Sequence, residues 1–127
     1  MSAPSLASRR RAERSGRVAE TLAAVWLFVK GYRILAQRAR TLYGEIDIAA
    51  MKGGALVIVE VKARPTLDGG VFAVTPKQRG RLQRAALDLA KRRRLGAVPI
   101  RFDLIVRQPG RGFTHIRGAW RADDGGF

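Results

Sequence analysis

The sequence predicts a single α/β domain, with a central mixed β-sheet of about five strands flanked by helices. A length of 127 residues fits one domain and leaves no room for two. Hydrophobic residues make up 46% of the chain, which is enough to build a core. Apolar residues recur at helical spacing in two segments and alternate in the others, in the order helix, three strands, helix, two strands.

The first helix is expected over residues 11–30. Large apolar side chains recur at helical spacing there and form one stripe: Val18, Leu22, Val25, Trp26 and Val29. Gly31 follows at a position where glycine commonly ends a helix. Residues 1–10 are expected to form a disordered basic arm and residues 122–127 a flexible tail, so that the folded domain spans residues 11–121.

Three strands are expected next, over Tyr32–Arg40, Glu45–Met51 and Ala55–Ala63. Glycines 53 and 54 mark a hairpin turn between the second and the third strand. Alternation then assigns side chains to faces of the sheet. The second strand has one face formed by Ile46, Ile48 and Ala50, and the third strand has one face formed by Ile58, Glu60 and Lys62.

The second helix has a clear start in the sequence. Thr75 is placed as the N-cap, Pro76 occupies the first helical position, and Gln78 completes a capping-box pattern. The helix is expected to continue to about Arg94, and the segment Arg64–Val74 before it is expected to be a loop. Two more strands are expected over Pro99–Arg107 and Gly112–Trp120.

The hairpin determines which charged residues face each other. If Gly53 and Gly54 are the turn residues, counting back along both strands places Asp47 opposite Glu60 and Glu45 opposite Lys62. Directly opposed residues have Cβ atoms roughly 4.5–5.5 Å apart, so the two carboxylates repel unless a cation lies between them. Either Lys62 or a divalent metal ion would serve. The alternative is a solvated polar face with ordinary surface salt bridges.

The composition adds a strong positive charge. Lys and Arg number 25 against 10 Asp and Glu, which gives a net charge of +15. Such a field attracts polyanions, of which nucleic acid is the commonest; a solvated basic surface and an anionic membrane surface are the alternatives. The absence of cysteine excludes disulfides, thiolate metal sites and thiol nucleophiles. The longest apolar run, Leu22–Val29, is too short to cross a membrane.

The acidic residues lie in a pattern that resembles a nuclease signature. Gly44-Glu45-Ile46-Asp47-Ile48, followed on the next strand by Glu60-Val61-Lys62, is similar to the PD-(D/E)xK pattern of metal-dependent nucleases. Residues 16–120 resemble the YraN-like family of bacterial proteins, thought to be related to archaeal-type Holliday junction resolvases. The matching segments include Gly31-Tyr32-Arg33-Ile34-Leu35, Ala73-Val74, Lys77-Gln78 and Arg101-Phe102-Asp103-Leu104-Ile105. The resemblance implies a restriction-endonuclease-like fold.

The same resemblance implies roles for individual residues. Asp47 and Glu60, with the Val61 carbonyl, would hold Mg²⁺ or Mn²⁺, which polarises the scissile phosphate and activates a water molecule. Lys62 would orient that water or offset developing negative charge. Glu20 matches the first-helix glutamate of the resolvase-like enzymes and would reach the metal through a water. The alternative for Glu20 is an exposed glutamate paired with Arg17.

Further residues are candidates for contact with nucleic acid: Arg64, Lys77, Gln78, Arg81, Arg84 and Lys91. The basic residues of the second helix share its non-apolar side, where a solvated helix surface is the alternative. Gln78 either points at the site or serves only the capping box. His115 has no partner cluster in the sequence and is interpreted as structural. Trp26 and Trp120 are interpreted as core or interface anchors.

The sequence therefore predicts a metal-dependent endonuclease that hydrolyses phosphodiester bonds in DNA. By analogy with the family, its substrate would be branched DNA in repair or recombination, and a homodimer is allowed. The expected location is cytoplasmic and nucleoid-associated, with no membrane and no small-molecule cofactor. The alternatives are a non-catalytic module that keeps the nuclease fold and binds nucleic acid or a protein, and a membrane-surface protein.

Overall fold

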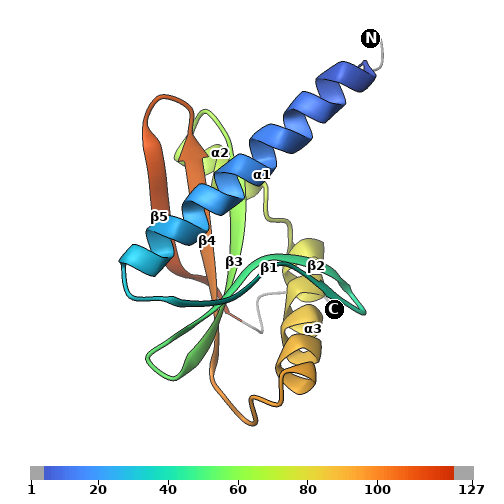
Figure 1. Cartoon of the computed structure of the whole chain (residues 1–127), viewed down its shortest axis with the longest axis vertical. Coiled ribbons are helices and arrows are strands. Elements are labelled where there is room, and N and C mark those ends of the chain that lie inside the picture. Colours follow the sequence, from blue (N-terminus) through green and yellow to red (C-terminus); the bar gives the residue numbers. More distant parts are fainter. Residues whose placement is uncertain (1–4, 122–127) are drawn as a thin grey trace.

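The computed structural model describes residues 5–121, except for the side chains of residues 8–15. In this part of the chain the predicted helices and strands occur in the predicted order, with one short helix added (Figure 1). The elements are α1 (Leu6–Val29), β1 (Arg33–Thr41), β2 (Gly44–Lys52), β3 (Ala55–Ala63), α2 (Leu67–Phe72), α3 (Pro76–Arg92), β4 (Ile100–Gln108) and β5 (Gly112–Trp120). The expected tail, and residues 1–4 of the expected arm, lie outside the described residues.

The strands form one sheet in chain order, β1-β2-β3-β4-β5. Strands β3 and β4 are parallel, and the other neighbours are antiparallel. A parallel pair needs a crossover connection, which α2 and α3 provide between the end of β3 and the start of β4. The predicted α/β class with a five-stranded mixed sheet is confirmed, and the architecture is consistent with a restriction-endonuclease-like fold.

Each face of the sheet is covered by one long helix. On one face, Leu56 and Ile58 pack with Leu82 and Leu89 of α3 in the larger hydrophobic cluster. On the other face, residues of the same strands pack against α1 in the second cluster, formed by Ala23, Ala24, Leu27, Tyr32, Ile48, Ala50, Val57, Val59 and Ile105. The middle strands are therefore buried on both sides, as their continuous apolar runs indicate.

Helix α1 differs from the sequence prediction in two respects. It begins at Leu6 rather than near residue 11, and its first turns extend beyond the sheet (Figure 1). The side chains that it buries against the sheet are small, namely Ala19, Ala23 and Ala24, together with Leu27. The large apolar stripe instead faces solvent, apart from the partly buried Trp26. Small side chains allow the helix backbone to approach the sheet closely, which explains why alanine occupies the inner face.

The β2–β3 hairpin has the predicted register. Gly53 and Gly54 adopt positive φ angles of 57° and 79°, as a tight two-residue turn requires, and Lys52 pairs with Ala55. The ladder continues regularly to the pair Ile48–Val59 and ends there. Because the strands separate beyond this pair, the expected pairing of Glu45 with Lys62 does not occur; Glu45 is exposed and lies 3.9 Å from Arg40 on β1.

The alternation of side chains along β2 breaks at Asp47. Ile48 belongs to the α1-side cluster and Ile46 to the α3-side cluster, so the prediction that both lie on one face is wrong. Arg38 lies across from Asp47 on β1, between Gln37, which pairs with Ile48, and Ala39, which pairs with Ile46. Its φ of 52° is unusual for a bulky residue and marks the local irregularity in the sheet.

The segment between β3 and α3 is not the uniform loop that was expected. Thr66 caps the short helix α2 by accepting a hydrogen bond from Gly69 N. Thr75 caps α3 by accepting from Gln78 N at 3.2 Å, and Pro76 follows, so the predicted helix start is confirmed. The helix ends at Arg92, slightly before the predicted end.

The contact between α2 and β4 gives a test of the packing. Gly70 is buried, and a Cβ atom there would lie 2.5 and 2.6 Å from the two methyl carbons of Val106. We expect Gly70→Ala to lower the free energy of unfolding by about 1–3 kcal/mol, measured by urea titration. Gly16→Ala is the control, because among the described side chains none lies within 4 Å of its Cβ position and alanine favours a helix. Equal stability of both variants would contradict this packing.

Candidate functional site

The two predicted acidic residues meet where β2 and β3 separate. The ladder ends at Ile48–Val59, so the expected pairing of Asp47 with Glu60 is not part of it; Asp47 and Glu60 are the next residues along β2 and β3. The Val61 N–H donates to Asp47 Oδ2 at 2.9 Å, so a side-chain carboxylate replaces a neighbouring strand as the acceptor for this backbone group. The carboxyl groups of Asp47 and Glu60 lie close enough to perturb each other's ionisation. The structure thus brings together Asp47, Glu60 and Val61.

Both carboxyl groups resist ionisation. Burial, followed by the nearby Glu60 carboxyl, raises the pKa of Asp47 to about 7. Burial likewise raises the pKa of Glu60, against the opposing influence of Lys62. The side chain of Glu60 is only 6% exposed. A largely buried pair of acids is therefore held together, and it would gain stability from binding a proton or another cation.

Two polar side chains contact Glu60 directly. Lys62 Nζ lies 3.3 Å from Glu60 Oε1, and its own side chain is mostly buried. Gln78 Nε2 donates to the same oxygen at 3.4 Å from the first turn of α3. The Gln78 side chain therefore points at the acids rather than back toward Thr75, and only the threonine half of the expected capping box is present.

Glu20 reaches the same region from α1. Its Oε2 accepts a hydrogen bond from Arg38 Nε at 2.9 Å, and its negative charge contributes to the raised pKa of Asp47. The partner of Glu20 is therefore Arg38 on β1, and the alternative pairing with Arg17 is not the one observed. The sequence offered no sign of this role for Arg38, because it depends on the positive φ angle and on the register between β1 and β2.

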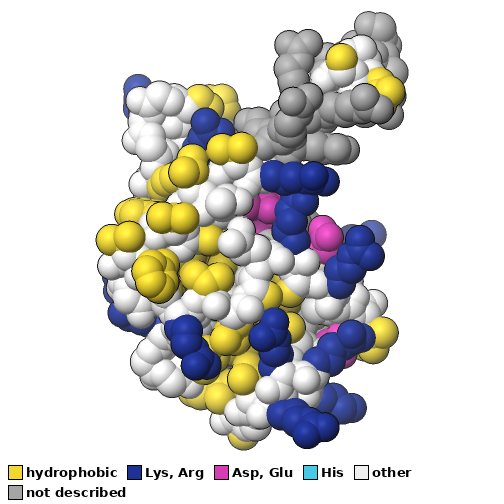
Figure 2. Space-filling view, viewed as in Figure 1, with side chains coloured by type: hydrophobic (Ala, Val, Ile, Leu, Met, Phe, Trp, Pro, Cys, Tyr) yellow, Lys and Arg dark blue, Asp and Glu magenta, His cyan; other side chains and the backbone are white. Residues whose placement is uncertain are grey.

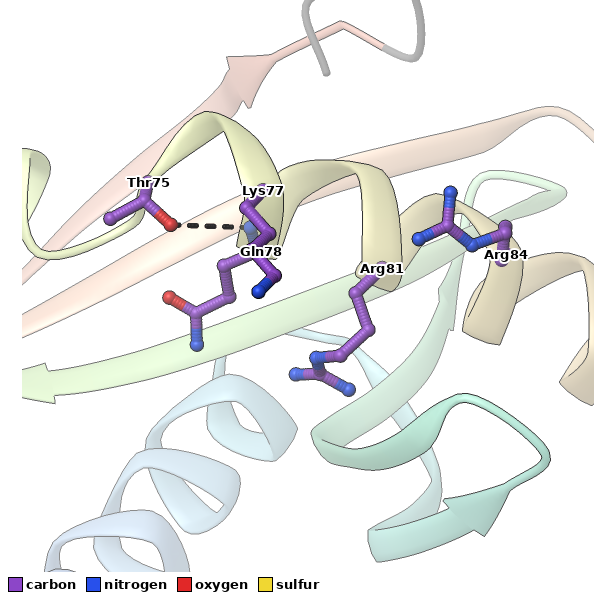
Figure 3. A pocket seen from close by; sticks show the side chains of 5 residues that line it. All are labelled: Thr75, Lys77, Gln78, Arg81 and Arg84. Atoms are coloured by element: carbon purple, nitrogen blue, oxygen red, sulfur yellow. Dashed lines mark hydrogen bonds between the residues drawn. The ribbon is translucent and has the colours of Figure 1, made fainter. Parts of the chain in front are cut away.

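Several candidate nucleic-acid contacts line a pocket on α3, beside these acids. The pocket has a volume of about 440 Å³ and is lined by Thr75, Lys77, Gln78, Arg81 and Arg84. Figure 3 shows that Gln78 and Arg81 project from the same side of the helix. Arg81 Nη1 also donates to the carbonyls of Tyr43 and Glu45, at 3.0 and 3.1 Å, and so ties the β1–β2 hairpin to α3.

The remaining basic candidates lie outside this pocket. Lys91 lines a neighbouring pocket of about 270 Å³, together with Tyr43 and with Arg84, which belongs to both pockets. Arg84 lies over the ring of Tyr43, at 5.8 Å from the ring centroid. Arg64 is exposed at the end of β3 and donates to the Ala63 carbonyl. The predicted basic residues of α3 are thus adjacent in space, while Arg64 stands apart.

A second polar cluster lies on the α1 side of the sheet, on β4 and β5, and sequence reasoning missed it. Asp103 is fully buried and accepts two hydrogen bonds from Arg101, at 2.9 and 2.8 Å. His115 Nε2 lies 2.8 Å from Asp103, and its Nδ1 lies 2.7 Å from Lys30 Nζ. The prediction that His115 has no partner cluster is therefore wrong.

The Asp103 cluster is fully compensated electrostatically. Burial alone would raise the pKa of Asp103, but the hydrogen bonds from His115, Arg101 and Gly118 lower it to about 2. The cluster ties the end of α1 to β4 and β5, and Arg101 also donates to the Tyr32 hydroxyl at 2.6 Å. Its chemistry is that of a buried ion pair with satisfied partners, in contrast to the two acids at positions 47 and 60.

The donor chemistry of the acid pair fits a divalent cation. Two carboxylates supply hard oxygen atoms, and a bound cation would relieve the repulsion and burial that raise both pKa values. Within residues 5–121, wherever side chains are described, no three His, Cys, Asp or Glu residues form a metal-binding group. A cation held here would therefore depend on Asp47, Glu60, backbone oxygen and water, as Mg²⁺ often does.

The fold and this geometry define an α/β protein of restriction-endonuclease-like architecture with a carboxylate pair at the separation of two strands. The family model described as "Uncharacterised protein family UPF0102" matches residues 19–106. A UPF0102 protein of Maricaulis maris is 48% identical over 118 residues, covering 92% of this chain and 93% of its own length. One from Paramagnetospirillum magneticum is 44% identical over 127 residues, with coverages of 96% and 98%. The chain belongs to the UPF0102 family, the YraN-like family that its motifs indicated.

In residues 5–121, no helix is both long enough and apolar enough to cross a bilayer. This agrees with the short apolar run seen in the sequence.

The raised pKa of Asp47 predicts a dependence of stability on pH. Its value in the folded state, about 7, lies above the ordinary value of 3.8, so the folded protein holds the proton more tightly. The free energy of unfolding therefore falls as the pH rises from about 4 to about 7, and it stays at the lower value at higher pH. We expect Asp47→Asn, which can still accept from Val61 N, to raise the melting temperature by about 5 °C or more at pH 8 in EDTA.

At pH 4 the same variant should melt close to the wild type, since Asp47 is then protonated when folded and still partly protonated when unfolded, so that little of the cost of its raised pKa remains. Asp88→Asn is the control, because the hydrogen bond from Leu42 N lowers the pKa of Asp88, the opposite direction. It should not stabilise the protein at pH 8. A gain for Asp47→Asn that is equal at both pH values would contradict this account.

Proposed function

We propose that this protein is a metal-dependent endonuclease that hydrolyses phosphodiester bonds in DNA. The single observation that carries the proposal is the convergence of Asp47 and Glu60 beside Lys62, next to a basic pocket. The same residues form the Asp…Glu-x-Lys pattern that resembles the PD-(D/E)xK nucleases. Glu60 is paired with Lys62, but a second acid, Asp47, also lies beside it and both pKa values are raised, which favours a role in holding a cation.

Each residue has a role that follows from its contacts. Asp47 and Glu60 would hold Mg²⁺ or Mn²⁺, with the Val61 carbonyl as a further oxygen donor. When bound, the cation supplies Lewis-acid chemistry at the phosphate and lowers the pKa of water. The ammonium group of Lys62 lies beside Glu60, at the proposed cation site. There it would offset the negative charge that develops on the phosphate. Glu20, which is paired with Arg38, would reach the cation from α1 through a water.

The residues of α3 would bind and orient the nucleic acid. Gln78 orients Glu60 through its hydrogen bond. Lys77 and Arg84 line the pocket beside the acids and present positive charge to the phosphate backbone. Arg81 keeps the β1–β2 hairpin in place, so that Asp47 stays beside the pocket. Branched DNA is the proposed substrate shape, which rests on the resemblance to Holliday junction resolvases.

Cleavage assays test the catalytic proposal directly. We expect the protein, with Mg²⁺ or Mn²⁺, to cut at least one of a labelled duplex, flap or four-way junction, and EDTA to abolish cutting. Asp47→Asn and Glu60→Gln should each lower the rate at least about 100-fold, because each removes an oxygen ligand. Glu45→Gln is the matched control, since the carboxylate of this exposed residue lies 3.9 Å from Arg40, away from the two acids, and its substitution should leave the rate unchanged.

The proposal fails if the wild-type protein cuts none of these substrates with either metal, or if Asp47→Asn cuts as fast as the wild type. Binding without cutting would favour the second candidate, a nucleic-acid-binding module that keeps the nuclease fold. That candidate is favoured by one observation, the lack of a third acidic ligand beside the pair among the described side chains. Isothermal titration with Mn²⁺ separates the two, because only the nuclease requires metal binding that depends on both acids.

DNA binding tests the pocket on α3 separately from catalysis. Lys77→Ala and Arg84→Ala should each weaken binding of a fluorescent DNA in EDTA, and each should reduce the slope of log affinity against log salt by about 0.9. Arg117→Ala is the charge-matched control, because Arg117 is exposed on β5 and acts electrostatically on Lys30, away from α3. Equal losses in all three variants would show that binding follows net charge rather than this pocket.

A further inference from the structure

Helix α1 carries a row of large apolar side chains that the rest of the described chain does not cover. The row consists of Val18, Leu22, Val25, Phe28 and Val29, whose exposed fractions are 56%, 49%, 55%, 68% and 76%. Figure 2 shows a hydrophobic surface over the C-terminal half of α1, with Lys and Arg side chains around its edge. A helix that is apolar on both sides is expected to be buried on both sides, and only its alanine side is buried here.

We propose that this row is the interface through which two copies of the chain pair, α1 against α1 in antiparallel orientation. Val18, Leu22, Val25 and Val29 are separated by four, three and four residues, the spacing of a seam between two packed helices. The spacing is the same from either end. A two-fold axis between Leu22 and Val25 therefore places Val18 of one copy against Val29 of the other, which is the self-complementarity that a symmetric dimer needs.

The surface beside the row has the shape that such a pairing requires. One hollow, of about 240 Å³, is lined by Arg17, Val18, Thr21 and Leu22. A second hollow, of about 180 Å³, is lined by Ala24, Val25, Phe28, Ile34 and Gln37. The two-fold axis brings the first hollow of one copy opposite Val25 and Val29 of the other, and the second hollow opposite Leu22. Side chains of each copy thus have a hollow to enter, as in helix packing in general.

The size of the row is sufficient for a specific contact between two copies. The five side chains expose roughly 500 Å² per copy, so that pairing removes about 1,000 Å² from water, where specific interfaces begin. The row contains no charged side chain, and the nearby Glu20 is already paired with Arg38. Arg17 lines the first hollow, so positive charge also lies beside the contact, and the repulsion between two copies of net charge +15 weakens as salt screens it.

Sedimentation of the full chain between about 1 and 100 µM tests the pairing. The wild type should form a dimer in this range, and Leu22→Glu with Val25→Glu should raise the dissociation constant at least about 100-fold. Leu87→Glu is the control, since Leu87 is 63% exposed on α3, outside the row, and should leave the dimer intact. Thermal melting of each variant verifies that it is folded.

Single cysteines test the orientation, because the chain has none of its own. A mixture of Val18→Cys and Val29→Cys proteins should cross-link with a short bis-maleimide at least about tenfold faster than either variant alone. In the antiparallel pair, residue 18 of one copy lies roughly 16 Å along the helix axis from residue 18 of the other copy. Residue 18 of one copy and residue 29 of the other are adjacent. Cross-linking of Val18→Cys alone at the rate of the mixture would overturn the antiparallel pairing.

Other results would overturn the interface itself. They are a wild type that stays monomeric at 100 µM, a dimer that Leu87→Glu dissociates as well as the row variant does, or a monomer that binds anionic phosphatidylserine vesicles through the row. The last result would assign the surface to a lipid instead of a second copy. None of these measurements involves metal or DNA, so their outcome is independent of the proposed nuclease activity.

Discussion

The arrangement of this protein depends on keeping two carboxylates close together inside a sheet. β2 and β3 pair regularly up to Ile48 and Val59 and then separate, and Asp47 satisfies the Val61 N–H that the end of the ladder leaves. Burial and mutual repulsion make this arrangement unfavourable, as the raised pKa of both acids shows. A natural protein keeps such a cost where it serves a function, and a bound cation would remove most of it.

The elements around the acids hold them without neutralising them. β3 is buried on both faces, so Glu60 stands on a rigid strand. Gln78 and Lys62 contact only one of its oxygens, and the first turn of α3 supplies the glutamine because Thr75 and Pro76 determine where that helix begins. Lys77, Arg81 and Arg84 of α3 line the pocket beside the acids, so that under the proposed function the surface for a polyanion would be separate from the site for a cation.

Helix α1 contributes at several points along its length. Glu20 joins the acidic site through Arg38, and the alanines pack closely on the sheet. Its C-terminal end is held by the Asp103 cluster through Lys30 and His115. A helix held in this way has a fixed orientation, and this orientation turns its large apolar residues outward. The exposed row is therefore a consequence of where the alanines and the anchors lie, and it is available to a second copy.

The sequence by itself determined the order of elements, the hairpin register and the start of α3, because these depend on local features: glycines at a turn, a threonine-proline cap and alternating β-branched residues. It also placed Asp47 beside Glu60, since register follows from turn length. Only the tertiary structure decided which side of α1 is buried, where the alternation of β2 breaks, and which partners Gln78, Arg38 and His115 take. Those features depend on contacts between residues far apart in the chain. In α1, the close packing of alanine side chains against the sheet outweighed the larger free energy that burying the valine and leucine side chains would have gained.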